Sequence, residues 1–223
     1  MDTVIIIQAR MGSTRFPGKI MKELTGRPVL WHVVRRAQNA KKADLAVVAT
    51  TTNVEDDIVE QFCKENNFPC YRGSAENVLS RYYEAAKAYG AGVVVRLTAD
   101  NPLVDPETID RCIEEFSRSR CDYVSTSAPP EDRTYPHGLD VEVFSFEALE
   151  RAFKEAKEPY EKEHVTPYIW ENKTGVFHVC PKLKAPSEYA RDYRLTVDYP
   201  EDFMLMEEIY KALYTNDNTI ISA

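Results

Sequence analysis

A loop of small residues and three cations follows the first apolar run of the sequence. The run ends at Gln8, and Arg10, Arg15 and Lys19 follow within the segment ARMGSTRFPGK. Arginine offers a planar pair of donors to phosphate oxygens, and lysine offers a compact positive charge. The loop therefore predicts a binding site for a polyphosphate. Solvated surface charges are the ordinary alternative.

Two common phosphate-binding loops do not match this segment. A Walker A loop follows the pattern G-x-x-x-x-G-K-[ST], in which the hydroxyl group holds magnesium. Here five residues separate Gly12 from Gly18, and Ile20 follows Lys19, so that hydroxyl group is missing. The G-x-G-x-x-G pattern of nicotinamide and flavin sites is also absent. A metal that accompanies the phosphates must therefore be held elsewhere in the chain.

Two aspartates are candidates for holding that metal. A divalent cation bound with a triphosphate is usually coordinated by carboxylates and phosphate oxygens. Asp100 in VVVRLTADNP and Asp198 in YRLTVDYPED each follow an apolar run and stand shortly before a proline. A turn-forming role for Asp100 and a helix-start role for Asp198 are the ordinary alternatives. The metal interpretation requires both aspartates to share one sheet edge with the cationic loop.

The elements that position these residues alternate between strands and helices. Continuous apolar strands in such an alternation favour a mostly parallel sheet that helices cover on both faces, and ligands of such sheets bind beyond the carboxyl ends of the strands. We expect the helix from residue 54 to begin at a capping box, Thr52 to Glu55. The first half predicts strands at 3–8, 44–50, 68–71 and 92–97 and helices at 28–38, 54–66, 75–89 and 105–118.

The second half is less regular. The turn-rich segment 126–137 predicts a loop or flap. No linker divides the chain, so we expect a single domain, 1–223, with 126–180 as an acceptor-site flap and dimerisation arm. The patterns predict strands at 121–125, 139–144, 175–180 and 193–197 and helices at 145–157, 160–172 (interrupted by Pro167) and 200–213.

Composition excludes several classes of protein. The chain has 223 residues, 43% of them hydrophobic, which suffices for a substantial core. A net charge of −8 disfavours nonspecific binding to nucleic acid. No segment matches a membrane span or a signal peptide. The five cysteines and four histidines show no metal-ligand spacing, which indicates reduced thiols in a cytoplasmic protein and no zinc site.

The segments QARMGSTRFPGKIM, GRPVLWHVVRRA, LTADNPLVDP and VDYPED occur in this order. Together they resemble the cytidylyltransferases that make CMP-activated sugars. RGSAENVLSRYYEAA and GLDVEVFS are similar to the branch of the spore coat polysaccharide biosynthesis protein F. The resemblance covers nearly the whole chain. It implies a Rossmann-like nucleotidyltransferase fold, a homodimer and a role in the biosynthesis of surface polysaccharide or glycoconjugate.

The resemblance also implies roles for single residues. Arg10, Arg15 and Lys19 match positions that hold the triphosphate and, with Asp100, are expected to be catalytic. Asp100 and Asp198 match ligands of Mg2+. The segment from Arg72 to Arg81 matches the surroundings of the cytosine and ribose. The residues expected to bind the nucleotide are Gln8, Ala9, Arg10, Gly12, Ser13, Thr14, Arg15, Lys19, Arg72, Ser74, Asn77, Arg81, Thr98 and Asp100.

The acceptor site is expected in the second half of the chain. LTADNP stands where the octulosonate enzymes carry Gln-Gly-Asp-Glu-Pro, and 126–180 is unlike theirs, so the acceptor and, to a smaller degree, the base stay open. A packed or surface histidine and an exposed strand acid are the ordinary alternatives for these candidates. The acceptor-binding candidates are His137, Asp140, Glu142, His164 and Tyr168.

The expected reaction joins CTP and an acidic or phosphorylated acceptor, and releases pyrophosphate. The acceptor oxygen attacks the α-phosphorus in line, so positioning and charge neutralisation are the main needs. Two alternatives stay open. A glycosyltransferase of related fold usually shows an Asp-x-Asp motif, whereas TADNP has one aspartate. A noncatalytic nucleotide-binding protein would have lost phosphate or metal residues that are present here.

Overall fold

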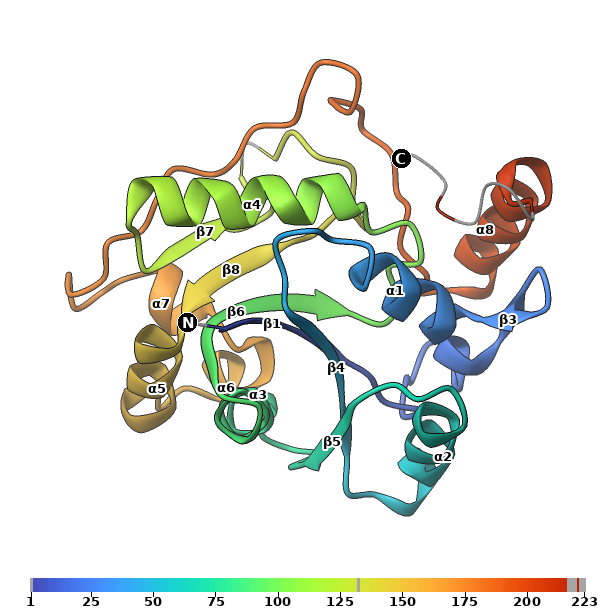
Figure 1. The fold of residues 1–223 in the computed structure, drawn as a ribbon, viewed down its shortest axis with the longest axis horizontal. Coiled ribbons are helices and arrows are strands. Elements are labelled where there is room, and N and C mark those ends of the chain that lie inside the picture. Colours follow the sequence, from blue (N-terminus) through green and yellow to red (C-terminus); the bar gives the residue numbers. More distant parts are fainter. Residues whose placement is uncertain (1, 132, 216–219, 221–223) are drawn as a thin grey trace.

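The computed structural model describes residues 2–131, 133–215 and 220, so a few positions of the expected 1–223 domain, residue 132 of the flap among them, lie outside it. Within this part, the centre is a six-stranded sheet in the order β5-β4-β1-β6-β8-β7 (Figure 1). The strands are β1 (Asp2–Gln8), β4 (Leu45–Thr51), β5 (Cys70–Gly73), β6 (Ala91–Thr98), β7 (Tyr123–Ser125) and β8 (Glu142–Ser145).

The sheet is mainly parallel, as the alternation of strands and helices predicts. β1 pairs in parallel with β4 and β6, and β4 pairs in parallel with β5. β8 runs antiparallel to both β6 and β7. The carboxyl ends of the four parallel strands therefore meet at one edge, with β1 between β4 and β6.

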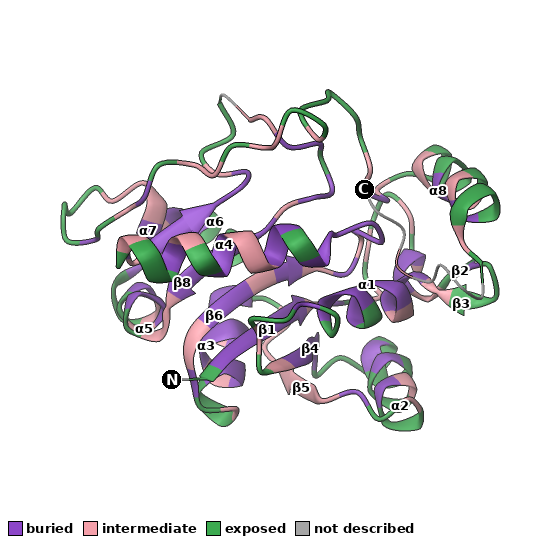
Figure 2. Cartoon of the chain, turned by 45° about the horizontal axis from the view of Figure 1, so that its top comes forward, coloured by how far each residue is buried: buried purple, intermediate pink, exposed green. Residues whose placement is uncertain are grey.

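Helices cover both faces of the sheet, which gives three layers (Figures 1 and 2). The helices that pack on the sheet turn a buried side to it and an exposed side to solvent (Figure 2). The fold class predicted from the sequence is confirmed. One core cluster joins the sheet to α1 (Val29–Ala37), α2 (Asp57–Glu65) and α4 (Pro106–Ser119). The other joins it to α3 (Val78–Ala88), α5 (Phe146–Glu155) and α7 (Pro167–Trp170), and the short α6 (Pro159–His164) packs on α3.

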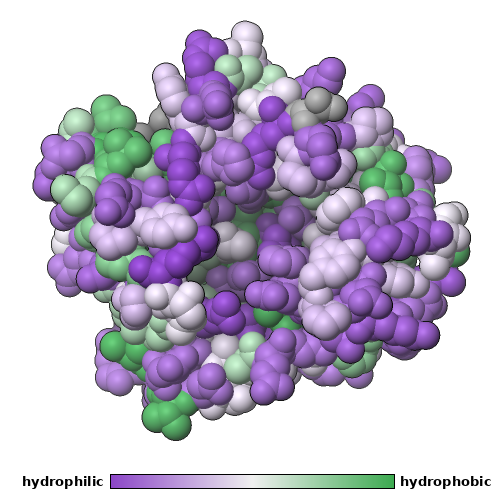
Figure 3. Space-filling model, turned by 180° about the vertical axis from the view of Figure 1, so that it is seen from behind, coloured by the Kyte–Doolittle hydropathy of each residue, from purple (hydrophilic) through white to green (hydrophobic). Residues whose placement is uncertain are grey.

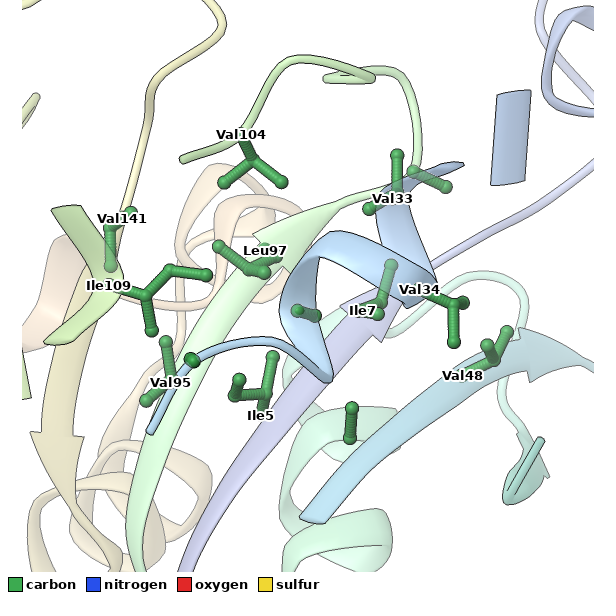
Figure 4. Close-up of a cluster of buried hydrophobic side chains, with 14 of the residues drawn as sticks. Ile5, Ile7, Val33, Val34, Val48, Val95, Leu97, Val104, Ile109 and Val141 are labelled. Atoms are coloured by element: carbon green, nitrogen blue, oxygen red, sulfur yellow. The ribbon is translucent and has the colours of Figure 1, made fainter. Parts of the chain in front are cut away.

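The central strand β1 shows why its apolar run is continuous. Successive side chains of a strand point to opposite faces, and both faces are buried here. Ile5 and Ile7 belong to the first cluster, whereas Ile6 belongs to the second. Figure 4 shows Ile5 and Ile7 in one cluster with Val33 and Val34 of α1. Apolar residues are therefore needed at successive positions from Val4 to Ile7, and a polar substitution there would be buried.

A third, smaller cluster lies beside the sheet. It packs α8 (Pro200–Leu213) against the hairpin of β2 (Glu23–Leu24) and β3 (Arg27–Pro28) through Leu24, Met206 and Tyr210. The short 3₁₀ helix η1 (Lys19–Met21) leads into this hairpin. The cluster therefore fixes the segment before α8 close to the first loop.

Three expectations about local structure are wrong. Segments 175–180 and 193–197 are not strands, because each makes a single bridge, Val179 to Tyr123 and Arg194 to His137, and no longer ladder. Isolated backbone hydrogen bonds, such as those from Cys180 N to Tyr123 O and from Val197 N to Asp100 O, hold these segments in place of a ladder.

The capping box at 52–55 is also not formed. Residues 54–56 form a 3₁₀ turn, η2 (Val54–Asp56), and α2 begins only at Asp57. The carboxylate of Asp56 instead accepts hydrogen bonds from Thr51 Oγ1 and from Met11 N, the latter at 2.6 Å. The start of α2 is thus built to hold the first loop.

Much of the segment 126–180 belongs to the central layers. β8 lies inside the sheet between β6 and β7, and α5 packs on α3 and β6. Within the described residues, no helix combines the length and the apolar character needed to cross a bilayer.

Candidate active site

The first loop leaves the carboxyl end of β1 and is fixed by backbone contacts. Met11 O accepts hydrogen bonds from Ser13 N at 2.8 Å and Gly18 N at 3.1 Å. Gly18 has a left-handed φ of 69°, which a residue with a side chain rarely adopts, and η1 begins immediately after it. The ends of the loop are thus joined by hydrogen bonds, and Lys19 is placed at the edge of the sheet.

Lys19 joins the two aspartates that the metal hypothesis requires. Its ammonium lies 2.7 Å from Asp100 Oδ2, 3.0 Å from Asp198 Oδ1 and 2.6 Å from Val197 O. The residue is only 8% exposed, and its three donors match three acceptors. The first loop, the end of β6 and the segment before α8 therefore meet at one buried positive charge.

Asp100 is held by the end of β6. Thr98 Oγ1 donates to Asp100 Oδ1 at 2.6 Å, and Asn101 Nδ2 donates to Thr98 Oγ1 at 3.0 Å. Val197 N donates to Asp100 O at 2.8 Å, so the strand end and the segment before α8 are joined through the backbone too. These bonds fix the direction of the Asp100 carboxylate.

Asp198 is surrounded by three cations. Besides Lys19, Arg15 Nη2 lies 2.6 Å from Asp198 Oδ1, and Arg194 Nη2 lies 2.6 Å from Asp198 Oδ2. Burial alone would raise the pKa of Asp198, but the hydrogen bond and charge of Lys19, with those of Arg194 and Arg15, lower it below its usual value. The carboxylate is therefore ionised at neutral pH.

Arg194 is a site residue that the sequence interpretation missed. It also lies 3.2 Å from Asp202 Oδ1, and Asp202 Oδ2 accepts a hydrogen bond from Asp198 N at 2.8 Å. The signal that could have found it is the order Arg-x-x-x-Asp-x-x-x-Asp in RLTVDYPED. Without a helix over 194–198, that spacing alone does not predict contact.

A cavity of about 570 Å³ opens at this edge of the sheet. From behind, the surface is hollowed near its centre, and most residues around the hollow are hydrophilic (Figure 3). Among the predicted site residues, the cavity is lined by Gln8, Ala9, Arg10, Gly12, Ser13, Thr14, Arg15, Lys19, Arg81, Thr98, Asp100, Asp140, His164 and Asp198. It is also lined by Ile20, Val78, Ala99, Asn101, Glu163 and Thr196, which were not predicted.

Three of the predicted nucleotide-binding residues are not in this lining. Asn77 Oδ1 caps α3 by accepting from Ser80 N at 2.9 Å, and Ser74 Oγ accepts from Asn77 N at 3.0 Å. Arg72, on β5, pairs with two carboxylates of α2, Asp57 at 2.7 Å and Glu60 at 2.8 Å. Each of these side chains therefore has a structural partner outside the cavity.

Arg81 connects that segment to the cavity. The residue is 1% exposed, and its Nη1 donates to Ser74 O. Burial lowers the pKa of its guanidinium, and the charge of nearby Arg10 lowers it further. Two guanidinium groups thus lie near one another beside the first loop, an arrangement that favours an anionic ligand.

The acceptor candidates divide in the same way. Asp140 lines the cavity and pairs with Arg133 at 2.8 Å, and His164 lines it from the end of α6. The other three candidates do not line it. Glu142 is buried in an ion pair, Tyr168 donates to Glu155, and His137 pairs through its backbone with residues 193 and 195.

The donor set suits a metal that the protein shares with its substrate. Within the described ranges no group of three or more His, Cys, Asp and Glu side chains could hold a metal ion by itself. Asp100 and Asp198 offer two carboxylates that converge on one point, the ammonium of Lys19. Mg2+ is commonly bound by one or two carboxylates together with substrate phosphates, so these residues fit that ion.

A family model and known proteins match nearly the whole chain. The model of a family described as cytidylyltransferase matches residues 4–220. The spore coat polysaccharide biosynthesis protein SpsF of Bacillus subtilis is 38% identical over 221 residues, which cover 96% of this chain and 86% of that protein. An uncharacterized protein of Methanocaldococcus jannaschii is 42% identical over 212 residues, covering 95% and 84%.

A solved structure extends the likeness to the fold. The structure of a cytidylyltransferase from Leptospira borgpetersenii superposes with a TM-score of 0.88 at 34% identity, covering 100% of this chain and 90% of that one. The match spans the first loop, both aspartates and α8. The chain therefore belongs to the cytidylyltransferase family, and it is a nucleotidyltransferase with a mainly parallel α/β fold.

Proposed function

We propose that this protein transfers CMP from CTP to an acidic sugar, or to another acidic or phosphorylated acceptor, and releases pyrophosphate. The observation that carries the proposal is the contact of Lys19 with both Asp100 and Asp198 at the mouth of a cationic loop. The relative named for spore coat polysaccharide biosynthesis supports a role in surface polysaccharide or glycoconjugate synthesis.

The triphosphate would bind along the first loop. Arg10, Arg15 and Lys19 line the cavity, and their charges would neutralise the pyrophosphate as it leaves. Arg15 is exposed enough to change partner, whereas Lys19 is buried and fixed by three acceptors. Lys19 is therefore the better preorganised of the two cations.

Asp100 and Asp198 would hold Mg2+, and phosphate oxygens of the substrate would complete its coordination. Such a cation would supply positive charge next to the reacting phosphate. The protein's own contribution is to hold both carboxylates so that they are aimed at one point. Thr98 does this for Asp100, and Arg194 does it for Asp198.

The acceptor would enter where Asp140, Glu163 and His164 line the cavity. These residues come from the loop before β8 and from α6, which are different elements from those that carry the cationic loop. Carboxylates accept hydrogen bonds from sugar hydroxyl groups, and the histidine can bind an anionic group of the acceptor. We also expect a homodimer, with part of 126–180 at its interface, and sedimentation of the purified protein tests this.

A matrix of four nucleoside triphosphates against a panel of acceptors tests the proposal. The panel contains octulosonic and nonulosonic acids, phosphorylated polyols and amino acids, and phosphonates, and pyrophosphate release is measured. The proposal expects release that depends on CTP and on one acidic or phosphorylated acceptor. The proposal would be contradicted if no acceptor of the panel led to release of pyrophosphate. Turnover of a sugar nucleotide in its place would support a glycosyltransferase.

A further inference from the structure

Four of the five cysteines fall into two neighbouring pairs. A side-chain interaction between Cys63, on α2, and Cys70, on β5, shifts the pKa of both thiols, and Cys180 raises the pKa of Cys121 in the same way. All of them are free thiols. Because a disulfide bond forms between neighbouring cysteines, both pairs are candidates for oxidation. The two pairs differ in their access to solvent.

A tight return of the chain brings the first pair together. α2 ends at Glu65, Asn67 adopts a left-handed φ of 55°, and Phe68 N donates to Cys63 O at 2.8 Å. β5 then begins at Cys70, alongside α2 (Figure 1). The two thiols thus lie at the ends of one short loop, so a bond between them requires no distant segment to move.

Access distinguishes the first pair from the second. Cys70 is partly exposed and lines a second cavity, beside Lys64 and Phe68, whereas Cys63 is fully buried. In the other pair both thiols are buried, with exposures of 4% for Cys121 and 8% for Cys180. A small reagent therefore reaches Cys70 before any other thiol of these two pairs.

The electrostatics point in the same direction. The hydrogen bond from Cys63 outweighs partial burial and, with the charge of Arg72, lowers the pKa of Cys70. Burial, followed by the hydrogen bond with Cys180, raises the pKa of Cys121 to about 12. Since the thiolate is the reactive form, the accessible thiol of the first pair is also the more nucleophilic one.

We propose that Cys63 and Cys70 form a redox-convertible dithiol, in which Cys70 exchanges with a small-molecule disulfide and Cys63 resolves the product. The Cys70 thiolate attacks one sulfur of the small disulfide, whose S–S bond breaks and releases one thiolate. Cys63 loses its proton to that thiolate and attacks the Cys70 sulfur, which releases the second small thiol. The protein loses two hydrogens, and the small disulfide is reduced to two thiols.

The resulting bond would tie the end of α2 to the edge strand of the sheet. The residue before α2, Asp56, holds Met11 N of the first loop. The redox state of the pair therefore acts on the helix that supports this loop. The proposal does not depend on which acceptor the enzyme uses.

Oxidation of the full-length protein by bis(2-hydroxyethyl) disulfide tests this, with intact mass and peptide mapping as the readouts. We expect the Cys63–Cys70 bond to form at least about tenfold faster than any oxidation of Cys121 or Cys180. Cys63→Ser should stop the reaction at a stable mixed disulfide on Cys70, and Cys70→Ser should abolish it. Cys180→Ser, the matched control, should react like the wild type.

Two results would overturn the proposal. One is a wild-type peptide map in which Cys63 and Cys70 stay reduced or in which Cys121 and Cys180 oxidise as fast. The other is a folded Cys63→Ser protein without an adduct on Cys70. If the Cys63→Ser variant does not fold, the peptide map of the wild-type protein alone tests the proposal. Pyrophosphate release is measured separately, so failure here leaves the proposed function standing.

Discussion

Arg194 holds Asp198 from the side opposite to Lys19. Its Nη2 lies 2.6 Å from Asp198 Oδ2, whereas Lys19 contacts Oδ1 of the same carboxylate at 3.0 Å. Asp202 fixes both partners, because it pairs with Arg194 and accepts the backbone N–H of Asp198. The carboxylate is thus clamped by groups that come from one short segment before α8 and from the first loop.

Loss of the contact between Arg194 and Asp198 should weaken metal binding more than it lowers the stability of the fold. Changes in groups that orient metal ligands typically cost about 10–100-fold in affinity or activity. We expect Arg194→Gln to weaken Mn2+ binding, measured by electron paramagnetic resonance in the presence of CTP, by about this factor. Arg191→Gln is the matched control, since that exposed side chain donates to the nearby backbone carbonyls of Ser187 and Ala190. Equal Mn2+ affinity in both variants would show that Arg194 does not position Asp198.

The ion pair of Glu142 and Arg96 should matter for stability. Glu142 is 6% exposed, and its Oε1 lies 2.9 Å from Arg96 Nη1. Loss of one partner of a buried pair leaves an uncompensated charge, which typically costs about 3–5 kcal/mol. We expect Glu142→Ala to lower the free energy of unfolding in urea by about this amount.

Asp140→Asn is the matched comparison for Glu142, because Asp140 precedes β8 on the same segment and lines the cavity. We expect it to raise the KM for the acceptor and to change the free energy of unfolding by about 1 kcal/mol or less. If Glu142→Ala instead left stability intact and raised the same KM, Glu142 would be an acceptor-binding residue, as the sequence interpretation expected.

His32 should make the protein less stable as the pH falls. The ring is 1% exposed, and its Nε2 lies 2.9 Å from Leu24 O. Burial lowers its pKa from 6.5 to about 4, despite that hydrogen bond, and the charge of Arg36 adds to the shift. Between these two pH values, the unfolded chain therefore binds a proton at His32 that the folded chain does not bind. The contribution of His32 to the free energy of unfolding is therefore complete above the pKa of the unfolded state. It is lost as the pH falls towards the pKa of the folded state.

The magnitude follows from the two pKa values. A separation of this size corresponds to about 3 kcal/mol of unfolding free energy. Urea unfolding of the wild type at a series of pH values, compared with His32→Gln, measures it. The glutamine can still donate to Leu24 O but does not titrate, so we expect a flatter profile. His178→Gln changes an exposed histidine and should keep the wild-type profile. Identical profiles for all three proteins would contradict this interpretation.

The sequence predicted the centre of the site better than its surroundings. The meeting of Lys19 and Asp100 follows from a general rule, since residues that follow parallel strands gather at one edge of a sheet. Asp198 lies at the same edge, as expected, but for a different reason, because the expected strand before it, 193–197, does not exist. The backbone bond of Val197 to Asp100 does the positioning in place of a strand.

Cross-strand partners were the main source of error. Glu142 lies on an alternating pattern that is typical of a half-exposed strand, but β8 is an inner strand of the sheet. Register between β6 and β8 places it opposite Arg96, and no local pattern reveals that register. The role of Asp56 could not be predicted for the same reason, because its hydrogen-bond partner Met11 is 45 residues away in the sequence.

Pyrophosphate release from CTP by Asp100→Asn, compared with the wild type, tests the central claim most directly. The amide keeps the shape of the side chain and can still accept from Thr98, but it removes one of the two charges that face Lys19. The account predicts wild-type release with CTP and an acidic or phosphorylated acceptor, and a loss of at least about 100-fold in kcat for Asp100→Asn. It also predicts a nearly unchanged melting temperature. Near-normal turnover in a folded Asp100→Asn protein would contradict the account.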